Sequence, residues 1–313
     1  MWAYFVGRLA IAVPTLFIVT IIVFGLQHLL PGDPALALLG EDRSPEAYEQ
    51  VRRQYNLDKP VVVQYGLWIG GALTGDLGVS LRTRTPVADL IVEKLPVTVQ
   101  LAFMAMAIAL LIGIPTGILS AVRKNSFWDY AASVLGLSGQ SVPTFWLGIM
   151  LILLFSVRWG VLPASGYVSP LEDLGENLRA MIMPAFVLGA ALAAVMMRHT
   201  RGAMLSVLRS DYVRTARAKG LAERRVVLRH ALRNALIPII TLGALQLGQL
   251  LSGAVLTEQV FTIPGFGKLI VDAVFNRDYA VVQGVVLVTA TAYIGLNLMA
   301  DMAYFLVNPR LRG

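Results

Sequence analysis

The residues with the clearest potential for covalent chemistry are a serine in a small-residue motif and three scattered histidines. Residues 136–139 read G-L-S-G, the G-x-S-G pattern of intramembrane serine proteases, with Ser138 as the candidate nucleophile. A serine becomes nucleophilic when an adjacent base takes its proton, yet His28, His199 and His230 all lie far from Ser138 in sequence. The motif therefore favours close helix packing over catalysis, and an intramembrane serine hydrolase is kept as an alternative.

Phosphate and metal chemistry are disfavoured by residue types and spacing. The segment GFGKL at 265–269 resembles the end of a phosphate-binding loop, but Leu269 replaces the required Ser or Thr, and Thr262 stands in place of the first glycine. The chain therefore cannot hydrolyse ATP by that route. The sequence has no cysteine and its histidines are dispersed, so thiolate and histidine metal sites are not expected. We predict no catalytic residue, metal or cofactor in this chain.

The elements that position these residues are those of a membrane protein. Of 313 residues, 57% are hydrophobic and 14% charged, and the mean hydropathy is +0.69, whereas soluble domains have about 45–50% apolar and about 25% charged residues. Six stretches approach or exceed the length of about 20 apolar residues that a bilayer requires. The sequence predicts an all-α integral membrane protein with transmembrane helices at about 9–30, 97–122, 130–157, 180–197, 235–257 and 280–307.

The long segment 31–96 between the first two spans is expected to be helical rather than a linker. Ser44 followed by Pro45 is typical of a helix start, and NLDKP at 56–60 stops the helix. In the stretch that follows, Tyr65 and Trp68 suit a position at the membrane interface.

The loops between the spans differ in charge. The N-terminus, 123–129, 198–234 and the tail hold fifteen Lys and Arg residues and three acids, Asp129, Asp211 and Glu223. The alternate loops hold eleven cations and fifteen acids. By the positive-inside rule the first set, including both termini, faces the cytoplasm. Basic residues beside an anionic leaflet gain about 1 kcal/mol each, so membrane lipid explains the net charge of +7 without a nucleic-acid partner.

Polar residues inside spans often mark function. Six of them, together with Pro143, form a candidate substrate pathway: Ser138, Gln140, Ser141, Gln246, Gln249 and Asn297. Proline removes a helix donor, so the third span should kink at Pro143. A kink at this place is equally consistent with the lining of a cavity and with helix packing alone. The two glutamines could instead form hydrogen bonds between helices. GIPTG at 113–117 has the small-xxx-small spacing of closely packed helices. Ionisable groups are almost absent from the spans, which disfavours an ion-coupled carrier.

The most basic loop, DYVRTARAKGLAERRVVLRHALRN at 211–234, predicts two short helices. Ser210 or Asp211 can cap the first, which ends at Gly220 in a left-handed conformation. The second carries an apolar stripe of Leu228, Ala231, Leu232, Ala235 and Leu236, with Arg225, Arg229 and Arg233 on another face. It should lie along the inner membrane surface and run into the fifth span, so that the first helix projects as a small knob.

Residues 214–220, RTARAKG, resemble the E-A-A-x-x-x-G loop of ABC-transporter permeases, in the form of the oligopeptide, dipeptide, nickel and glutathione importer group. Ala216 and Gly220 match the second Ala and the Gly of that motif, whereas Arg214 and Thr215 replace its Glu and first Ala. Nine further motifs resemble the first permease subunit of that group: LLPGDPA at 29–35, NLDKPVVVQY at 56–65, GDLGVS at 75–80, LPVTVQLA at 95–102, VPTFWLG at 142–148, LPASG at 162–166, EQVFTIPGFGKL at 258–269, NRDYAVVQG at 276–284 and NPRLR at 308–312.

This resemblance implies a type I ABC importer permease with a helical extracytoplasmic segment. Its domains would be 1–95, the first span with the outer segment, and 96–313, the permease domain with a coupling loop at 199–234. The implied partners are a second homologous permease, two ATPases that use ATP and Mg²⁺, and an extracytoplasmic solute-binding protein. A stand-alone secondary transporter or channel stays an alternative.

The resemblance also implies sites and a location. The ATPase would dock on Arg214, Thr215, Ala216, Arg217, Ala218, Lys219 and Gly220. The binding protein would contact Glu258, Phe261, Pro264, Gly265 and Asp278. The cargo would be short peptides or a related small solute, and the chain would lie in the cytoplasmic membrane of a bacterium or archaeon.

Overall fold

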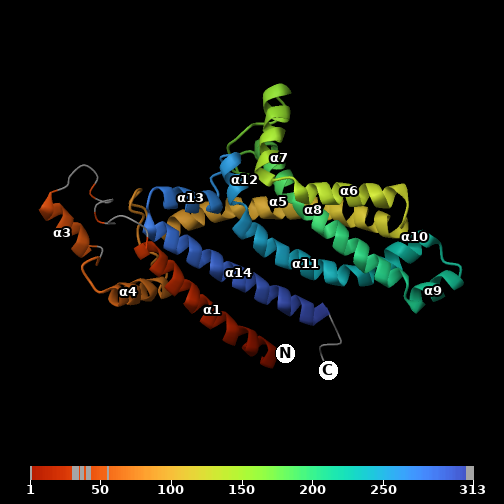
Figure 1. The fold of residues 1–313 in the computed structure, drawn as a ribbon, viewed down its shortest axis with the longest axis horizontal. Coiled ribbons are helices and arrows are strands. Elements are labelled where there is room, and N and C mark those ends of the chain that lie inside the picture. Colours follow the sequence, from red (N-terminus) through yellow and green to blue (C-terminus); the bar gives the residue numbers. More distant parts are fainter. Residues whose placement is uncertain (1, 30–34, 36–38, 40–43, 55, 308–313) are drawn as a thin grey trace. The chain divides into compact units, whose positions relative to one another are not determined.

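The computed structural model describes residues 2–29, 35, 39, 44–54 and 56–307, and the elements in these ranges are helices (Figure 1). The all-α class is confirmed. The elements are α1 (Trp2–Leu29), α3 (Pro45–Gln54), α4 (Val61–Leu73), α5 (Val87–Val122), α6 (Phe127–Ser141), α7 (Thr144–Leu151), a π-helical segment (Ile152–Arg158), α8 (Leu174–Leu208), α9 (Asp211–Ala218), α10 (Glu223–Arg225), a second π-helical segment (Val226–Ala231), α11 (Leu232–Gly253), α12 (Val255–Val260), α13 (Phe266–Phe275) and α14 (Tyr279–Val307).

Within the described residues, five helical stretches are long and apolar enough to cross a membrane, and the bent pair α6–α7 makes a sixth if it counts as one span. This agrees with the six predicted spans. Helix α5 is longer than its predicted span, because it begins at Val87 and not near residue 97. The polar residues of its first turns end the apolar run but not the helix, since Val87 and Ile91 are buried.

The chain divides into two compact units, residues 1–97 with 264–294 and residues 98–263 with 295–313. The segment 264–294 thus packs with the N-terminal part. The predicted domains 1–95 and 96–313 stay a prediction.

The first unit joins α1 to the predicted outer segment. Helix α3 begins where expected, and the Ser44 hydroxyl accepts a hydrogen bond from the Ala47 N–H at 3.3 Å. In α4, the Tyr65 hydroxyl lies 2.8 Å from the Thr20 hydroxyl of α1, and Trp68 stacks against Phe24. The core of this unit comes from the start of α5, α13 and the start of α14: Val87, Ile91, Phe266, Ala273, Val281 and Val285.

In the second unit, the predicted small-xxx-small motif packs α5 against α8. A Cβ atom on Gly113 would lie 2.6 Å from the Cβ of Met196, and one on Gly117 would lie 2.6 Å from the Cβ of Thr200. Real Cβ atoms do not approach so closely, so only glycine fits at these positions without movement of a helix. The packing role of GIPTG is confirmed.

Helix α6 is tied to α8 by a buried ion pair. Asp129 is 3% exposed and accepts hydrogen bonds from Arg201 Nε at 2.8 Å and Nη2 at 3.0 Å. The Ser120 hydroxyl and the Asn125 N–H also donate to the Asp129 carboxylate. These donors satisfy a carboxylate that would otherwise be costly to bury.

The third predicted span is broken rather than merely kinked. Helix α6 ends at Ser141, Val142 and Pro143 have extended backbones, and α7 continues at an angle of 98°. The residue before a proline is pushed out of the helical region, which is what Val142 shows. The two arms together have the length of one span, but they do not share an axis.

Candidate functional site

The predicted knob exists as α9, and its two faces differ. Val213 and Ala216 face inward and are buried against Val226, whereas Arg214, Thr215 and Ala218 are exposed. The two buried residues are three positions apart and therefore share one helical face. Of the small residues singled out in the sequence, Ala218 is thus available to a partner, while Ala216 supports the helix from behind.

The turn after α9 has the predicted geometry. Gly220 has φ of +74°, the left-handed conformation that favours glycine. Ser210 is the N-cap residue of α9, as predicted, but its hydroxyl makes no capping hydrogen bond and donates to the Val207 carbonyl.

An ion pair braces the knob against the next helix. Arg217 donates to both carboxylate oxygens of Glu223, from Nη2 at 2.7 Å and from Nε at 3.1 Å. The hydrogen bonds to Glu223 raise the pKa of the Arg217 guanidinium, so this cation stays charged throughout the physiological range. Tyr212 also accepts a hydrogen bond from Asn234 at 2.7 Å. The knob is therefore held at both ends to the helix that follows it.

The second predicted helix runs into the fifth span as expected, since the helical stretch from Glu223 to Leu250 is continuous. Its buried stripe differs from the predicted one. Val227, Ala231 and Ala235 are buried with Met204 of α8, whereas Leu228 is 47% exposed. The π-helical turn from Val226 to Ala231 shifts the register, which explains why the simple helical spacing misplaced Leu228.

The candidate pathway residues differ in their exposure. Ser138, Gln140, Ser141 and Pro143 are exposed, Gln249 is exposed, and Gln246 is half-buried. The amide oxygen of Asn297 is buried without a hydrogen-bond partner among the described residues. The break at Pro143 places the exposed polar group at a corner between α6 and α7. Their role in a pathway stays a prediction.

The hydrolase motif serves helix packing. A Cβ on Gly136 would lie 2.4 Å from the methyl group of Met197, and one on Gly139 would lie 3.4 Å from the Ala190 carbonyl oxygen. In the part of the chain whose side chains are described, no hydrogen bond joins Ser138 to His199 or His230. The side chain of His28 lies outside that part.

Most residues predicted to contact a binding protein are buried in the chain. Glu258 and Phe261 belong to the second unit, where the Glu258 carboxylate accepts a hydrogen bond from the Thr98 hydroxyl at 2.5 Å. In the first unit Gly265 is buried, Pro264 is half-buried, and Asp278 is 4% exposed.

Asp278 holds the loop before α5 to the start of α14. Its carboxylate accepts hydrogen bonds from the Ser80 hydroxyl at 2.5 Å and from the Leu81 N–H at 3.1 Å. The same segment exposes Phe275, Asn276 and Arg277 instead. A contact through Asp278 or Glu258 themselves stays a prediction, and these side chains have structural partners in the chain.

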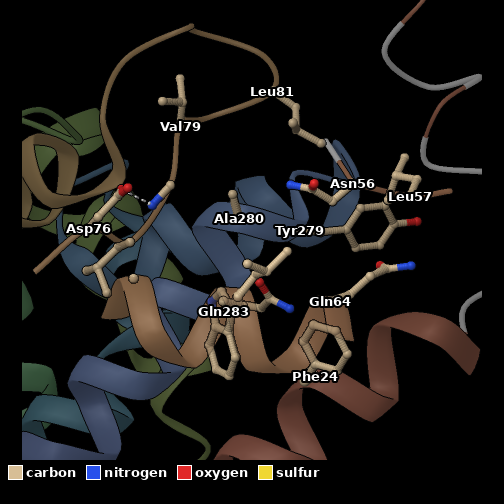
Figure 2. Close-up of a pocket in the computed structure, with 15 residues that line it drawn as sticks. Phe24, Asn56, Leu57, Gln64, Asp76, Val79, Leu81, Tyr279, Ala280 and Gln283 are labelled. Carbon is tan, nitrogen blue, oxygen red and sulfur yellow. Dashed lines mark hydrogen bonds between the residues drawn. The ribbon is translucent and has the colours of Figure 1, made fainter. Parts of the chain in front are cut away.

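Sequence reasoning missed a pocket in the first unit, which has a volume of about 280 Å³. Figure 2 shows the side chains of Asn56, Gln64, Tyr279 and Gln283 around this space, with Phe24 of α1 beside them. No motif brings these residues together, because they come from segments far apart in the sequence. The side-chain amides of Gln64 on α4 and Gln283 on α14 were the weak sequence signal for this pocket.

Comparisons with known proteins decide the family. Residues 113–313 match the family described as binding-protein-dependent transport system inner membrane component, and residues 1–102 match the N-terminal family of such membrane components. The chain belongs to this permease family. It is therefore a membrane-spanning transport subunit of an ATP-binding-cassette importer, and the resemblance noted in its motifs is confirmed.

Relatives of this permease match over its whole length. It is 43% identical to the dipeptide transport system permease protein DppB of Escherichia coli strain K12, covering 100% of this chain and 99% of the relative. It is also 43% identical to the di/tripeptide transport system permease protein DppB of Pseudomonas aeruginosa, with the same coverage.

A solved structure, titled as inward-facing conformations of the MetNI methionine ABC transporter, aligns with a TM-score of 0.56. It covers 70% of this permease and 96% of the solved chain at 20% identity, which shows a shared fold. Together with the helices described above, this confirms the type I importer permease fold.

Proposed function

We propose that this permease forms one half of a pathway that carries short peptides into the cytoplasm of a bacterium or archaeon. The other half is a second, homologous permease, and a solute-binding protein delivers the peptide from outside. Two separate ATPases, which use ATP and Mg²⁺, drive the transport. Identity of 43% over full length to permeases named for dipeptide and di/tripeptide transport supports this cargo.

The observation that carries the coupling role is the two-faced structure of α9. Its outer face exposes Arg214, Thr215, Ala218 and Lys219, while its inner face is fixed by the packing of Val213 and Ala216 against Val226. A knob of this kind can enter a groove on an ATPase without deforming. We infer that Arg214, Thr215, Ala218 and Lys219 form the docking surface and that Ala216 positions it.

The packing behind α9 gives a route for motion. Val207 and Leu208 at the end of α8 and Val226 at the start of the next helix all contact the buried face of the knob. A further buried cluster, which includes Met204 and Ala231, joins α8 to the helix that leads into α11, about one helical turn farther from α9. A displacement of α9 by a closing ATPase would therefore move α8 and α11 together, and both lead into spans.

The test is substrate-stimulated ATPase activity and dipeptide uptake by the reconstituted importer with its cognate partners. Ala218→Trp fills the outer face of the knob, so we expect at least a tenfold loss of both activities. Co-purification should show a weakened ATPase and a retained second permease. Ser206→Trp, an exposed position in the last turn of α8, is the matched control and should leave both activities unchanged.

Two results would contradict the proposal. Full stimulation in Ala218→Trp would show that α9 is not the docking surface. Uptake by the purified chain without an ATPase would instead favour a stand-alone transporter. Full transport by Ser138→Ala would rule out the hydrolase alternative, because the candidate nucleophile would then be dispensable.

A further inference from the structure

An apolar groove lies between the end of α5 and the helix that begins at α10, within the second unit. Its volume is about 470 Å³, within the range of about 300–1,000 Å³ typical of small-molecule sites. Figure 1 shows α10 at the same end of α11 as α9. The lining is almost entirely aliphatic and consists of Pro115, Ile118, Leu119, Val122, Val227 and Leu228, with Glu223 and Arg224 at one end.

The walls of this groove are exposed although they are apolar. Leu119 is 37%, Val122 is 41% and Leu228 is 47% exposed. The π-helical turn directs Leu228 away from the buried stripe of its own helix and toward α5. Exposed aliphatic walls that face each other across a gap favour an apolar occupant over water.

One cation lines the groove, and two more follow one of its lining residues in the sequence. Arg123 and Lys124 follow Val122 directly, and Arg224 lines the groove. None of these three cations forms an ion pair with a described residue. The acid at the rim, Glu223, is already neutralised by the two hydrogen bonds from Arg217. The groove therefore combines an aliphatic lining with nearby cations that form no ion pair with a described residue.

We propose that this groove binds one acyl chain of an anionic phospholipid, whose phosphate lies against Arg123, Lys124 and Arg224. The charge fits an anionic headgroup, and basic pockets at the ends of transmembrane helices are known to bind such lipids. The groove also lies at the end of α5, where Arg123 and Lys124 follow the apolar run. A change from apolar to charged residues is typical of the level at which a bilayer changes from acyl chains to headgroups.

The site has a consequence for coupling. Arg224 follows Glu223, the residue that braces α9 through Arg217. A lipid held between α5 and Arg224 fixes the helix on which that brace rests. Anionic lipid should therefore support transport by this permease, in addition to the ATPase contact proposed above, on which the lipid site does not depend.

Lipid binding is tested first on the purified full-length chain in detergent. Native mass spectrometry measures retention from an equimolar mixture of phosphatidylglycerol and phosphatidylcholine with the same acyl chains. Because each basic residue near an anionic lipid contributes about a fivefold preference, the wild type should retain phosphatidylglycerol at least about fivefold more. Arg123→Gln, Lys124→Gln and Arg224→Gln combined should abolish that preference.

The matched control removes the same number of cations from positions that do not line the groove. Arg225→Gln, Arg229→Gln and Arg233→Gln remove three exposed cations and should keep the preference. An equal loss in both triple variants would show general attraction to the basic loop and overturn the proposal. So would equal retention of both lipids by the wild type.

The occupant is identified in the assembled importer. A photoreactive phenylalanine analogue at Leu228 should cross-link to phospholipid, detected as an added lipid mass on the peptide that contains residue 228. Cross-links to an ATPase or to the second permease would overturn the lipid assignment. This result is independent of transport, since a failed ATPase contact at Ala218 would leave the Leu228 cross-link to lipid unchanged.

Discussion

Single residues fix the closest contacts in the second unit. Gly117 of α5 faces Thr200 of α8, with no room for a Cβ between them. Individual charged residues also make specific contacts. The three acids in the predicted cytoplasmic loops each pair with an arginine: Asp129 with Arg201, Asp211 with Arg214, and Glu223 with Arg217.

Gly117→Ala should destabilise the chain. The added Cβ would lie 2.6 Å from the Thr200 Cβ and 2.7 Å from the Met197 carbonyl oxygen, so α8 must shift. Overpacking of this kind costs about 1–3 kcal/mol. We expect a lower unfolding temperature in detergent, measured by fluorescence-detected size-exclusion chromatography after heating.

The matched control is Gly202→Ala on α8, where a Cβ would meet no atom within 4 Å. It should be neutral or stabilising, because alanine favours a helix over glycine by up to about 1 kcal/mol. Equal melting of the two variants would contradict the close contact of α5 with α8 at Gly117.

At the scale of helices, prolines have different effects in different places. Pro184 lies inside α8 and Pro238 inside α11, and both helices continue through them. Only at Pro143, among these three, does the preceding residue leave the helical conformation and the axis turn by 98°. The sequence indicated this site because small and polar residues precede the proline. The size of the bend was not predictable, since it depends on how α7 packs against α12.

Pro143→Ala should straighten part of the population of α6 and α7. A straight helix places residues 134 and 153 about 28 Å apart along its axis, at 1.5 Å per residue, and a 98° bend brings them closer. Spin labels at the exposed positions Val134 and Leu153 measure this by pulsed electron paramagnetic resonance. We expect a longer distance component in the Pro143→Ala variant.

Pro184→Ala, with the same two labels, is the control and should leave the distance distribution unchanged. An unchanged distribution in Pro143→Ala as well would show that packing holds the bend without the proline. The contact responsible would be Gly148, where a Cβ would lie 3.2 Å from the Phe261 ring.

For the whole molecule, local patterns predicted the helices well and the sites less well. Composition and apolar length were sufficient for the all-α membrane fold, and the Gly220 turn followed from residue type. Burial within the chain was not predictable in the same way. Ala216, Asp278 and Glu258 carry no local sign that they face inward, because their partners come from other helices or from loops far along the chain.

Orientation in the membrane is the whole-molecule property that the charge distribution predicts most directly. Fifteen of 26 cations lie in the loops assigned to the cytoplasm, with only three acids. The sequence has no cysteine, so a single introduced cysteine reports one position. Lys219→Cys lies in the proposed cytoplasmic knob, and Glu172→Cys and Asn276→Cys lie in outer loops, all at exposed positions.

A membrane-impermeant maleimide should label the variants at residues 172 and 276 in intact spheroplasts. It should label the variant at residue 219 only after the membrane is permeabilised, because the positive-inside rule predicts that the basic loop carrying α9 is cytoplasmic. Labelling at residue 219 in intact spheroplasts would reverse the assignment. It would also place α9 beyond the reach of a cytoplasmic ATPase, so the orientation and the proposed coupling stand or fall on the same measurement.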